Sequence, residues 1–236
     1  MRNVASIASR ELKSYFVSPV AYAVGFFFLL IMGAWFYFIT LRGTHAASLV
    51  GIFDLLGYLC VPVAAVITMH LFAEERRSGT IELLMTYPIN DWEVVVGKYL
   101  ASLFLYLFVL ALSLQYPIIL GMMGSPDWGA IFTGYIGALL LGAAFLAMGV
   151  LASSLTRSAV VAAIICLLML FTLRMLSAGS TIGGGLGTVL HYISFSGQLN
   201  DFSKGLIDTR DIVYLGSFII FTLFTAVRVI EINRWK

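Results

Sequence analysis

The side chains of this 236-residue sequence that could do chemistry are few and scattered. Its three histidines, His45, His70 and His191, stand far apart, and the sequence contains no HExxH zinc pattern. Glu74 follows His70 by four residues, a spacing that places both on one face of a helix. A metal site needs further ligands, so we interpret this pair as a solvated helix end.

Cysteine and aspartate chemistry is equally poorly supported. Cys60 and Cys166 both fall inside apolar runs, and we interpret them as small buried hydrophobic residues rather than metal ligands or redox groups. Asp54 stands alone at the edge of an apolar run, where an interfacial role is favoured over catalysis. An intramembrane enzyme is therefore disfavoured, and loss of a chemical activity on replacing His70 or Asp54 would revive it.

Nucleotide chemistry would require a phosphate-binding loop, and none is recognisable. The glycines at 183–185 and Gly187 do not fit GxxxxGK[ST], and Gly97-Lys98 is followed by Tyr99 with no glycine at the earlier position. We interpret the glycine run as a flexible external loop and expect no cofactor in this chain. If the protein moves a compound against a gradient, the energy must come from another polypeptide.

The elements that must position these few side chains are membrane helices. Hydrophobic residues make up 61% of the chain and charged residues 11%, with a mean hydropathy of +0.99, whereas soluble proteins average roughly 25% charged residues. The net charge of +2 is too small to suggest nucleic acid as a partner, and the basic residues do not cluster on a soluble domain.

Six segments are long and apolar enough to cross a bilayer, which takes about 20 residues. These segments are 20–41, 55–73, 94–123, 128–155, 158–178 and 212–230. They predict an all-α integral membrane protein in which residues 1–236 form one transmembrane domain. Pro117 should kink the third span or end its regular part. The pairs Ala138/Gly142 and Ala143/Ala147 should let another helix approach the fourth span closely.

The starts of several helices are marked by capping signals. Residues 3–16 place apolar side chains on one face and polar or basic ones on the other, which predicts an amphipathic helix at the membrane surface. Ser18 then supplies an N-cap and Pro19 a first helical residue for the first span. Asn90 and Glu93 stand at capping-box spacing before the third span.

The basic residues predict the orientation of the chain. With the N-terminus in the cytoplasm, ten basic residues lie on the cytoplasmic side and four on the other, so both termini and the loop 74–93 are predicted to be cytoplasmic. Arg174 falls near the outer end of the fifth span, where it could attract an anionic substrate or snorkel to the headgroups. We favour snorkelling.

The densest block of charged residues lies in the middle of the sequence, between two predicted spans. Residues 70–98 hold eight of the chain's 26 charged side chains. The second span is expected to continue as a helix past Phe72, with Arg76 and Arg77 in its last turn, where bases complement the negative helix end. Gly79 suits the left-handed residue that follows such a helix.

A second, shorter helix is expected after this glycine. Thr80 can cap it, Ile81, Leu84 and Met85 would share its apolar face, and Pro88 follows its end. An apolar ridge flanked by charges suits a groove on a soluble partner. The alternative is a helical hairpin that merely lies on the bilayer.

These residues resemble a known family. Residues 74–84 (EERRSGTIELL), 88–92 (PINDW) and 96–98 (VGK) are similar to the first cytoplasmic loop of type-two ABC exporter permeases, with gliding-motility and copper-processing permeases as the most similar branch. Residues 201–211 (DFSKGLIDTRD) resemble the segment before the last span of that branch. With the six spans, the resemblance covers essentially the whole chain.

The resemblance implies the type-two exporter permease fold, with transport and ATP hydrolysis carried out by separate subunits. Two permease copies, identical or related, would be coupled to separate cytosolic ATPase subunits that hold ATP and Mg²⁺. Residues 80–87 would form the coupling helix in a cleft of the ATPase, 3–16 the interfacial elbow helix and 179–210 an external or re-entrant gate. The residues implied at the ATPase contact are Glu74, Glu75, Arg76, Arg77, Gly79, Thr80, Ile81, Glu82, Leu84 and Met85.

The leading hypothesis is thus a non-catalytic permease subunit of an ATP-driven exporter in a bacterial or archaeal plasma membrane, with auxiliary proteins as further partners. A second hypothesis is a membrane anchor that holds a cytosolic ATPase for motility or signalling without transporting anything. Flux in reconstituted vesicles discriminates between the two, because the anchor predicts nucleotide-dependent changes without movement of a substrate.

Overall fold

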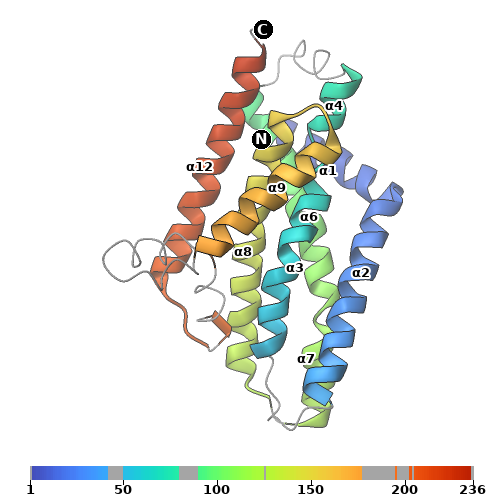
Figure 1. The fold of residues 1–236 in the computed structure, drawn as a ribbon, viewed down its shortest axis with the longest axis vertical. Coiled ribbons are helices and arrows are strands. Elements are labelled where there is room, and N and C mark those ends of the chain that lie inside the picture. The colour runs from blue at the N-terminus through green and yellow to red at the C-terminus, as the bar shows by residue number, and fades with distance from the viewer. Residues whose placement is uncertain are drawn as a thin grey trace.

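A computed structural model describes residues 2–41, 50–79, 90–124, 126–176, 195, 202–203 and 205–234. Within this part of the chain the regular elements are helical and no strand occurs. In chain order they are α1 (Arg2–Val17), α2 (Pro19–Trp35), the π-helical η1 (Phe36–Leu41), α3 (Val50–Thr68), α4 (Ala73–Ser78), α6 (Asp91–Leu112), α7 (Gln115–Met123), α8 (Trp128–Leu155), α9 (Ala159–Met175) and α12 (Thr209–Arg234). Figure 1 shows them as an elongated bundle.

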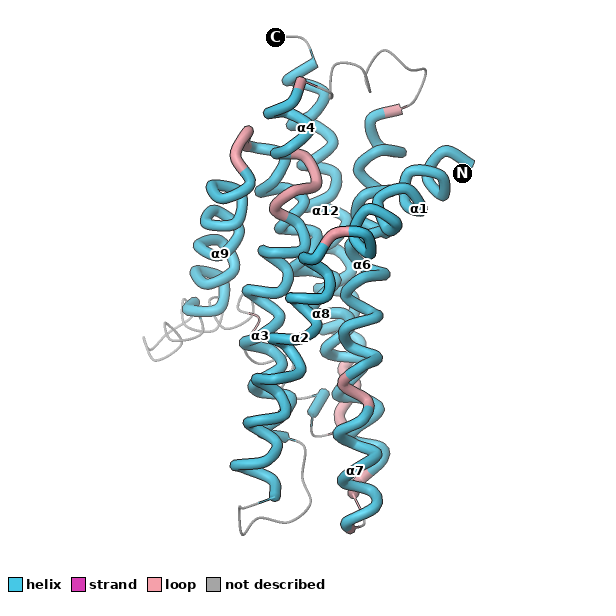
Figure 2. Tube along the Cα trace, turned by 90° about the vertical axis from the view of Figure 1, so that its right-hand side faces the viewer, coloured by secondary structure: helices cyan, strands magenta, loops and turns pink. Residues whose placement is uncertain are grey.

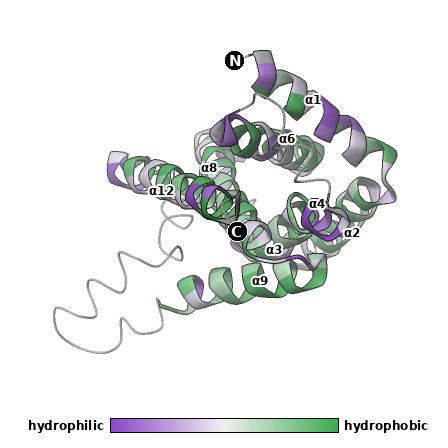
Figure 3. Ribbon diagram, turned by 90° about the horizontal axis from the view of Figure 1, so that it is seen from above, coloured by the Kyte–Doolittle hydropathy of each residue, from purple (hydrophilic) through white to green (hydrophobic). Residues whose placement is uncertain are grey.

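Helix α8 forms the centre of the bundle. It packs against α3, α6, α9 and α12, and 72% of its most apolar stretch is buried, compared with 17% for α12. Helix α1 lies across the bundle instead of along it, at the end that also holds α4 and the last turns of α12 (Figure 2). Seen from above, α1 combines polar and apolar residues while the long helices are mainly apolar (Figure 3).

The described part of the chain contains five helices that are long and apolar enough to cross a membrane. They are Pro19–Phe38, Gly51–Ser78, Asp91–Met122, Trp128–Leu155 and Thr209–Ile232. The predicted fifth span, 158–178, forms the apolar helix α9 of 17 residues, which is shorter than the others. The chain is therefore an all-helical, multi-pass membrane protein over its described residues, and the count of six spans stays a prediction.

The close approach expected on the fourth span is present. Tyr106 of α6 donates a hydrogen bond to the Ala138 carbonyl (2.8 Å), and Tyr99 donates to the Ala143 carbonyl (3.2 Å). A Cβ atom at Gly142 would collide with the Tyr106 ring. The small residues of α8 thus make room for tyrosine rings of α6, whose hydroxyls find acceptors inside an apolar bundle.

Two predicted helix starts are confirmed. The Ser18 hydroxyl accepts a hydrogen bond from Val20 N (3.3 Å) at the start of α2, with Pro19 in the first position. At the start of α6, Asn90 N donates to Glu93 Oε2 (3.3 Å). Both contacts satisfy backbone donors that the first turn of a helix leaves without an intrahelical acceptor.

The third span is interrupted, as Pro117 predicted. Helix α6 ends at Leu112 and α7 begins at Gln115, so residues 113–114 form a break that we call the outer break. Proline has no N–H to donate to the carbonyl four residues earlier, that of Ser113. This carbonyl accepts instead from Tyr116 N (3.1 Å) and from the Tyr135 hydroxyl (3.0 Å).

Only parts of the predicted external segment 179–210 belong to the described residues. Phe195 and Phe202 are both buried, and the Phe202 carbonyl accepts a hydrogen bond from the Thr133 hydroxyl of α8 (2.8 Å). The remainder of the predicted gate up to residue 201 lies outside the described residues.

Candidate functional site

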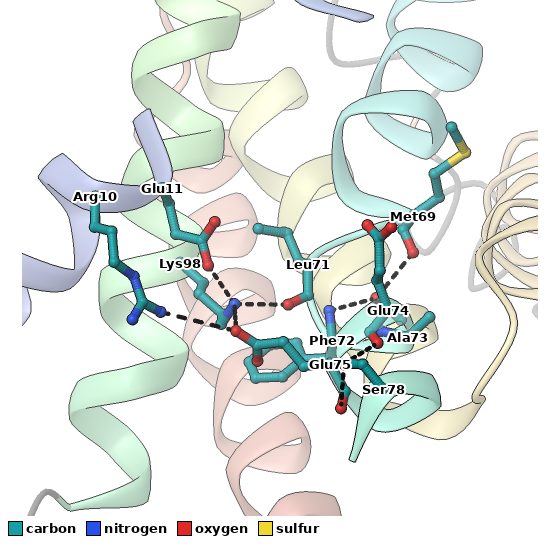
Figure 4. A network of polar contacts seen from close by, with 11 residues as sticks. Arg10, Glu11, Met69, Leu71, Phe72, Ala73, Glu74, Glu75, Ser78 and Lys98 are labelled. Carbon is teal, nitrogen blue, oxygen red and sulfur yellow. Dashed lines mark hydrogen bonds and ion pairs between the residues drawn. The ribbon is translucent and has the colours of Figure 1, made fainter. Parts of the chain in front are cut away.

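The second span is interrupted near its cytoplasmic end, where the sequence predicted a continuous helix past Phe72. The prediction holds in part, because the helical stretch Gly51–Ser78 does pass Phe72, but residues 69–72 form a turn between α3 and α4, which we call the inner break. A single hydroxyl from α8, that of Ser153, accepts from Phe72 N (3.0 Å) and Ala73 N (3.2 Å) and donates to the Met69 carbonyl (3.3 Å). Figure 4 shows these backbone groups gathered at the break.

A buried lysine from α6 completes the inner break. Lys98 is 1% exposed, and its Nζ donates to the Leu71 carbonyl (2.7 Å). The same Nζ pairs with Glu75 Oε1 of α4 (2.8 Å) and with Glu11 of α1. A buried ammonium is costly unless it is paired and hydrogen-bonded. Three acceptors from three parts of the chain meet that requirement (Figure 4).

The charges at this site balance. Lys98 faces two carboxylates, and Arg10 of α1 lies 3.9 Å from Glu75, so that two cations and two anions meet. We call Arg10, Glu11, Glu75 and Lys98 the Lys98 cluster. Because Arg10 is 63% exposed, its long contact adds little. The buried lysine with its two carboxylates therefore joins α1, α4 and α6.

Helix α1 is attached to the bundle along its whole length. Asn3 Nδ2 donates to Glu93 Oε2 of α6 (3.2 Å), and the Tyr15 hydroxyl donates to the Ile67 carbonyl of α3 (2.7 Å). Burial, with a smaller contribution from the charge of a nearby glutamate, raises the pKa of Tyr15 well above its ordinary value, so the hydroxyl stays a donor. A Cβ atom at Gly97 would press against the Ile7 side chain and the Val4 carbonyl of α1.

The helix that leads into the predicted coupling segment ends as expected. Arg76 and Arg77 occupy the last turn of α4, and Gly79 follows in the left-handed conformation with φ of 71°. At the other side of α4, His70 Nδ1 lies 3.2 Å from Glu74 Oε2. Within the described residues no group of three or more metal-ligating side chains occurs. The described part of the predicted contact thus consists of a short charged stem.

The other predicted contact residues cannot be placed. Thr80, Ile81, Glu82, Leu84 and Met85 all lie outside the described residues, and so does the predicted coupling helix that they would form.

Arg174 has a role that neither sequence interpretation included. Its Nη1 donates to the Gly57 carbonyl (2.9 Å), and its guanidinium lies 3.9 Å from the centre of the Tyr58 ring. The side chain therefore joins α9 to α3 through a backbone carbonyl and a cation–π contact.

Sequence reasoning also missed the most buried functional candidates. Lys98 stands four residues into the predicted third span, 94–123, where a cation needs a partner. That signal was available, but Glu11 lies 87 residues away from Lys98 and only the fold brings them together. Ser153 gave no signal, because a serine in an apolar helix commonly bonds to its own backbone.

Comparison with known proteins supports a transport role. Residues 5–215 match the family described as "ABC-2 family transporter protein". Two curated relatives, both named "Inner membrane transport permease YhhJ", come from Escherichia coli (strain K12) and Shigella flexneri. Each is 32% identical to this chain over 119 residues, which is 50% of this chain and 32% of the relative. The match therefore covers about a third of the relatives' length.

Proposed function

Because the chain belongs to the ABC-2 family of transporter proteins, we propose that it is the permease subunit of an ATP-driven exporter. Two permease copies, identical or related, would form the translocation path. Separate cytosolic ATPase subunits would bind ATP and Mg²⁺ and would contact the loop 74–93. This chain would then carry no catalytic residues of its own, in keeping with its lack of a recognisable phosphate-binding loop.

The observation that carries this proposal is the buried contact between the stem α4 and two other helices. Glu75 of α4 pairs with Lys98 of α6, which also pairs with Glu11 of α1. A force applied to the segment after Gly79 would therefore reach α6 and α1 directly, without passing along α3. Rigid-body movement of this unit is one way in which membrane helices can switch between inward-open and outward-open states.

Several finer features belong to the same proposal. The bundle would cross the plasma membrane of a bacterium or archaeon six times, with both termini cytoplasmic and α1 at the membrane surface. Residues 80–87 would form the coupling helix, and 179–210 the outer gate. The gliding-motility and copper-processing permeases remain the branch that the loop resembles, and auxiliary membrane or extracytoplasmic proteins would complete the complex.

The test uses the permease together with the ATPase that co-purifies with it, reconstituted in lipid vesicles. Glu82→Lys or Leu84→Asp should abolish the stimulation of ATP hydrolysis by the permease while the chain stays inserted. Asp54→Lys is the matched control, because it reverses an exposed acid at the other end of α3. It should leave the stimulation intact.

Three results would contradict the proposal or part of it. Full stimulation in both loop variants would rule out the loop as the ATPase contact. Equal loss in the Asp54 control would show a general effect of charge reversal. Stimulated hydrolysis without uptake of any compound from a panel of labelled lipids, peptides and sugars would favour the membrane anchor instead.

A further inference from the structure

Two arginines lie on neighbouring elements, Arg76 on α4 and Arg157 on the turn between α8 and α9. Helix α4 packs against both of these helices. Arg76 is partly buried in α4, and this burial, with a smaller contribution from the positive charge of Arg157, lowers the pKa of Arg76. Two guanidinium groups on adjacent elements repel each other, and an anion that binds between them removes this repulsion.

The turn that carries Arg157 is fixed by a local hydrogen bond. Helix α8 ends at Leu155 and α9 begins at Ala159, and Ser158 N donates to the Thr156 hydroxyl (3.2 Å) across the tip of the turn. Arg157 is exposed at this tip. Its backbone position is therefore defined while its side chain is accessible to a ligand.

Neither arginine has an acidic partner in the part of the chain that the structure describes. Nη2 of Arg76 is shielded from solvent and has no hydrogen-bond acceptor there. Other cations in the described residues do have acidic partners. Lys98 pairs with two carboxylates, and Arg228 pairs with Glu231 (2.7 Å). A donor that is buried without an acceptor costs free energy, which a ligand oxygen would recover after a small rotation of the side chain.

The surface beside these arginines is apolar, which favours one class of anion. Leu155 is 47% exposed, Val160 67% and Val161 44%, and all three belong to the apolar helices α8 and α9. Cations at the end of two spans, next to exposed aliphatic side chains, match a lipid whose phosphate lies at the headgroup level and whose acyl chains lie below. A carboxylate on a soluble partner would have no use for the aliphatic surface.

We propose that Arg76 and Arg157 together bind the headgroup phosphate of an anionic phospholipid at this end of the bundle, with Leu155 and Val160 contacting its acyl chains. Arg76 belongs to the stem α4, so the lipid would join that stem to the α8–α9 turn. This site requires neither an ATPase nor a transported compound.

The experiment titrates the purified full-length chain in neutral detergent with phosphatidylglycerol and counts bound lipid by native mass spectrometry. Phosphatidylcholine with the same acyl chains is the reference. Arg76→Gln and Arg157→Gln should each weaken phosphatidylglycerol binding by about fivefold, and the double variant by about tenfold or more. Arg228→Gln is the matched control, because it removes the same charge at the same end from a residue with its own acidic partner.

The outcomes separate the lipid from other sources of the anion. Equal phosphatidylglycerol binding by wild type and double variant, or an equal loss in Arg228→Gln, would overturn the proposal. Complete displacement of the lipid by excess inorganic phosphate would also overturn it, because the acyl chains would then contribute nothing. If the double variant kept the lipid but lost its ATPase on co-purification, the site would be a protein contact. Should Arg76→Gln fail to fold, Arg157→Gln alone decides, since that residue is exposed at the tip of a turn.

Discussion

The inner break at residues 69–72 and the outer break at 113–114 interrupt two long membrane helices by opposite means. The outer break has a cause in its own sequence, because Pro117 cannot donate to the Ser113 carbonyl. The inner break contains neither proline nor glycine. Its freed backbone groups are bonded by Lys98 and Ser153, which come from other helices. One break is thus encoded locally, and the other exists only through packing.

This difference between the two breaks has a functional consequence within the proposed transporter. A break held by side chains from α6 and α8 should respond when those helices move, whereas a break caused by proline should persist in every state. The inner break is also the one next to α4, the stem of the proposed ATPase contact. Variants that remove its side-chain partners are therefore the most direct way to test the comparison.

The largest effect is expected from Lys98→Met. This change leaves Glu11 and Glu75 close together and largely buried without their cation, and breaking such a pair costs about 3–5 kcal/mol of unfolding free energy. Unfolding in mixed micelles measures it. Lys13→Met, at an exposed lysine of α1, is the control and should change little.

A second substitution tests whether that loss is electrostatic. Adding Glu75→Gln to Lys98→Met removes one of the two facing carboxylates and should restore part of the stability. If Lys98→Met unfolds no more easily than Lys13→Met, the Lys98 cluster does not hold the inner break.

Ser153→Ala should have the next largest effect. It leaves Phe72 N, Ala73 N and the Met69 carbonyl without their partner, at a cost of about 1–3 kcal/mol. Hydrogen exchange should accelerate at the amides of residues 72 and 73. Ser154→Ala is a closely matched control, because that hydroxyl donates only within its own helix, to Leu151 (2.7 Å). Equal exchange in both variants would argue against a role of Ser153.

Tyr135→Phe removes the corresponding bond at the outer break, that to the Ser113 carbonyl. We expect a smaller loss of about 0.5–1.5 kcal/mol, since one neutral hydrogen bond is removed and the proline remains. Tyr22→Phe, at a residue that is 63% exposed, serves as the control. A loss larger than that of Ser153→Ala would reverse the ranking of the two breaks.

The smallest effect on stability is expected from Pro117→Ala. The new N–H can donate to the Ser113 carbonyl. Because that carbonyl already accepts from the Tyr135 hydroxyl, the free energy of unfolding should change by less than about 1 kcal/mol. The angle between α6 and α7 should change more than the stability does. Spin labels placed at the exposed positions Phe104 and Met122 should move apart as α6 and α7 straighten into one helix. An unchanged distance would show that packing, and not proline, fixes the outer break.

These two breaks also mark how far the sequence could predict the fold. Local signals located the outer break, the cap at Ser18 and the left-handed Gly79, because each depends on a residue and its immediate neighbours. The fourth span was placed at 128–155, which are the bounds of α8. The inner break was missed, because the side chains that hold it, Lys98 and Ser153, stand 27 and 81 residues away from the backbone groups of the turn that they bind.

The candidate site shows the same division. The charged stem with Arg76 and Arg77 in its last turn followed from sequence, whereas the partners of Glu75 did not. Hydropathy placed Lys98 near the start of the predicted third span, 94–123, but gave no indication that a carboxylate of α1 would approach it. Long-range pairing of a single buried charge leaves no periodic trace in a sequence, so it emerged only from the packed structure.

The short helix α9 has a consequence for the surrounding bilayer. Its 17 residues span about 26 Å at 1.5 Å per residue, compared with a typical hydrocarbon thickness of about 30 Å. Its inclination to the bundle, visible in Figure 1, shortens its reach further. A helix of this length that crosses a bilayer imposes a hydrophobic mismatch, which lipids relieve by local thinning. Within the six-span arrangement proposed above, the membrane should therefore be thinnest along α9, and lipid headgroups there would have the shortest distance to cross.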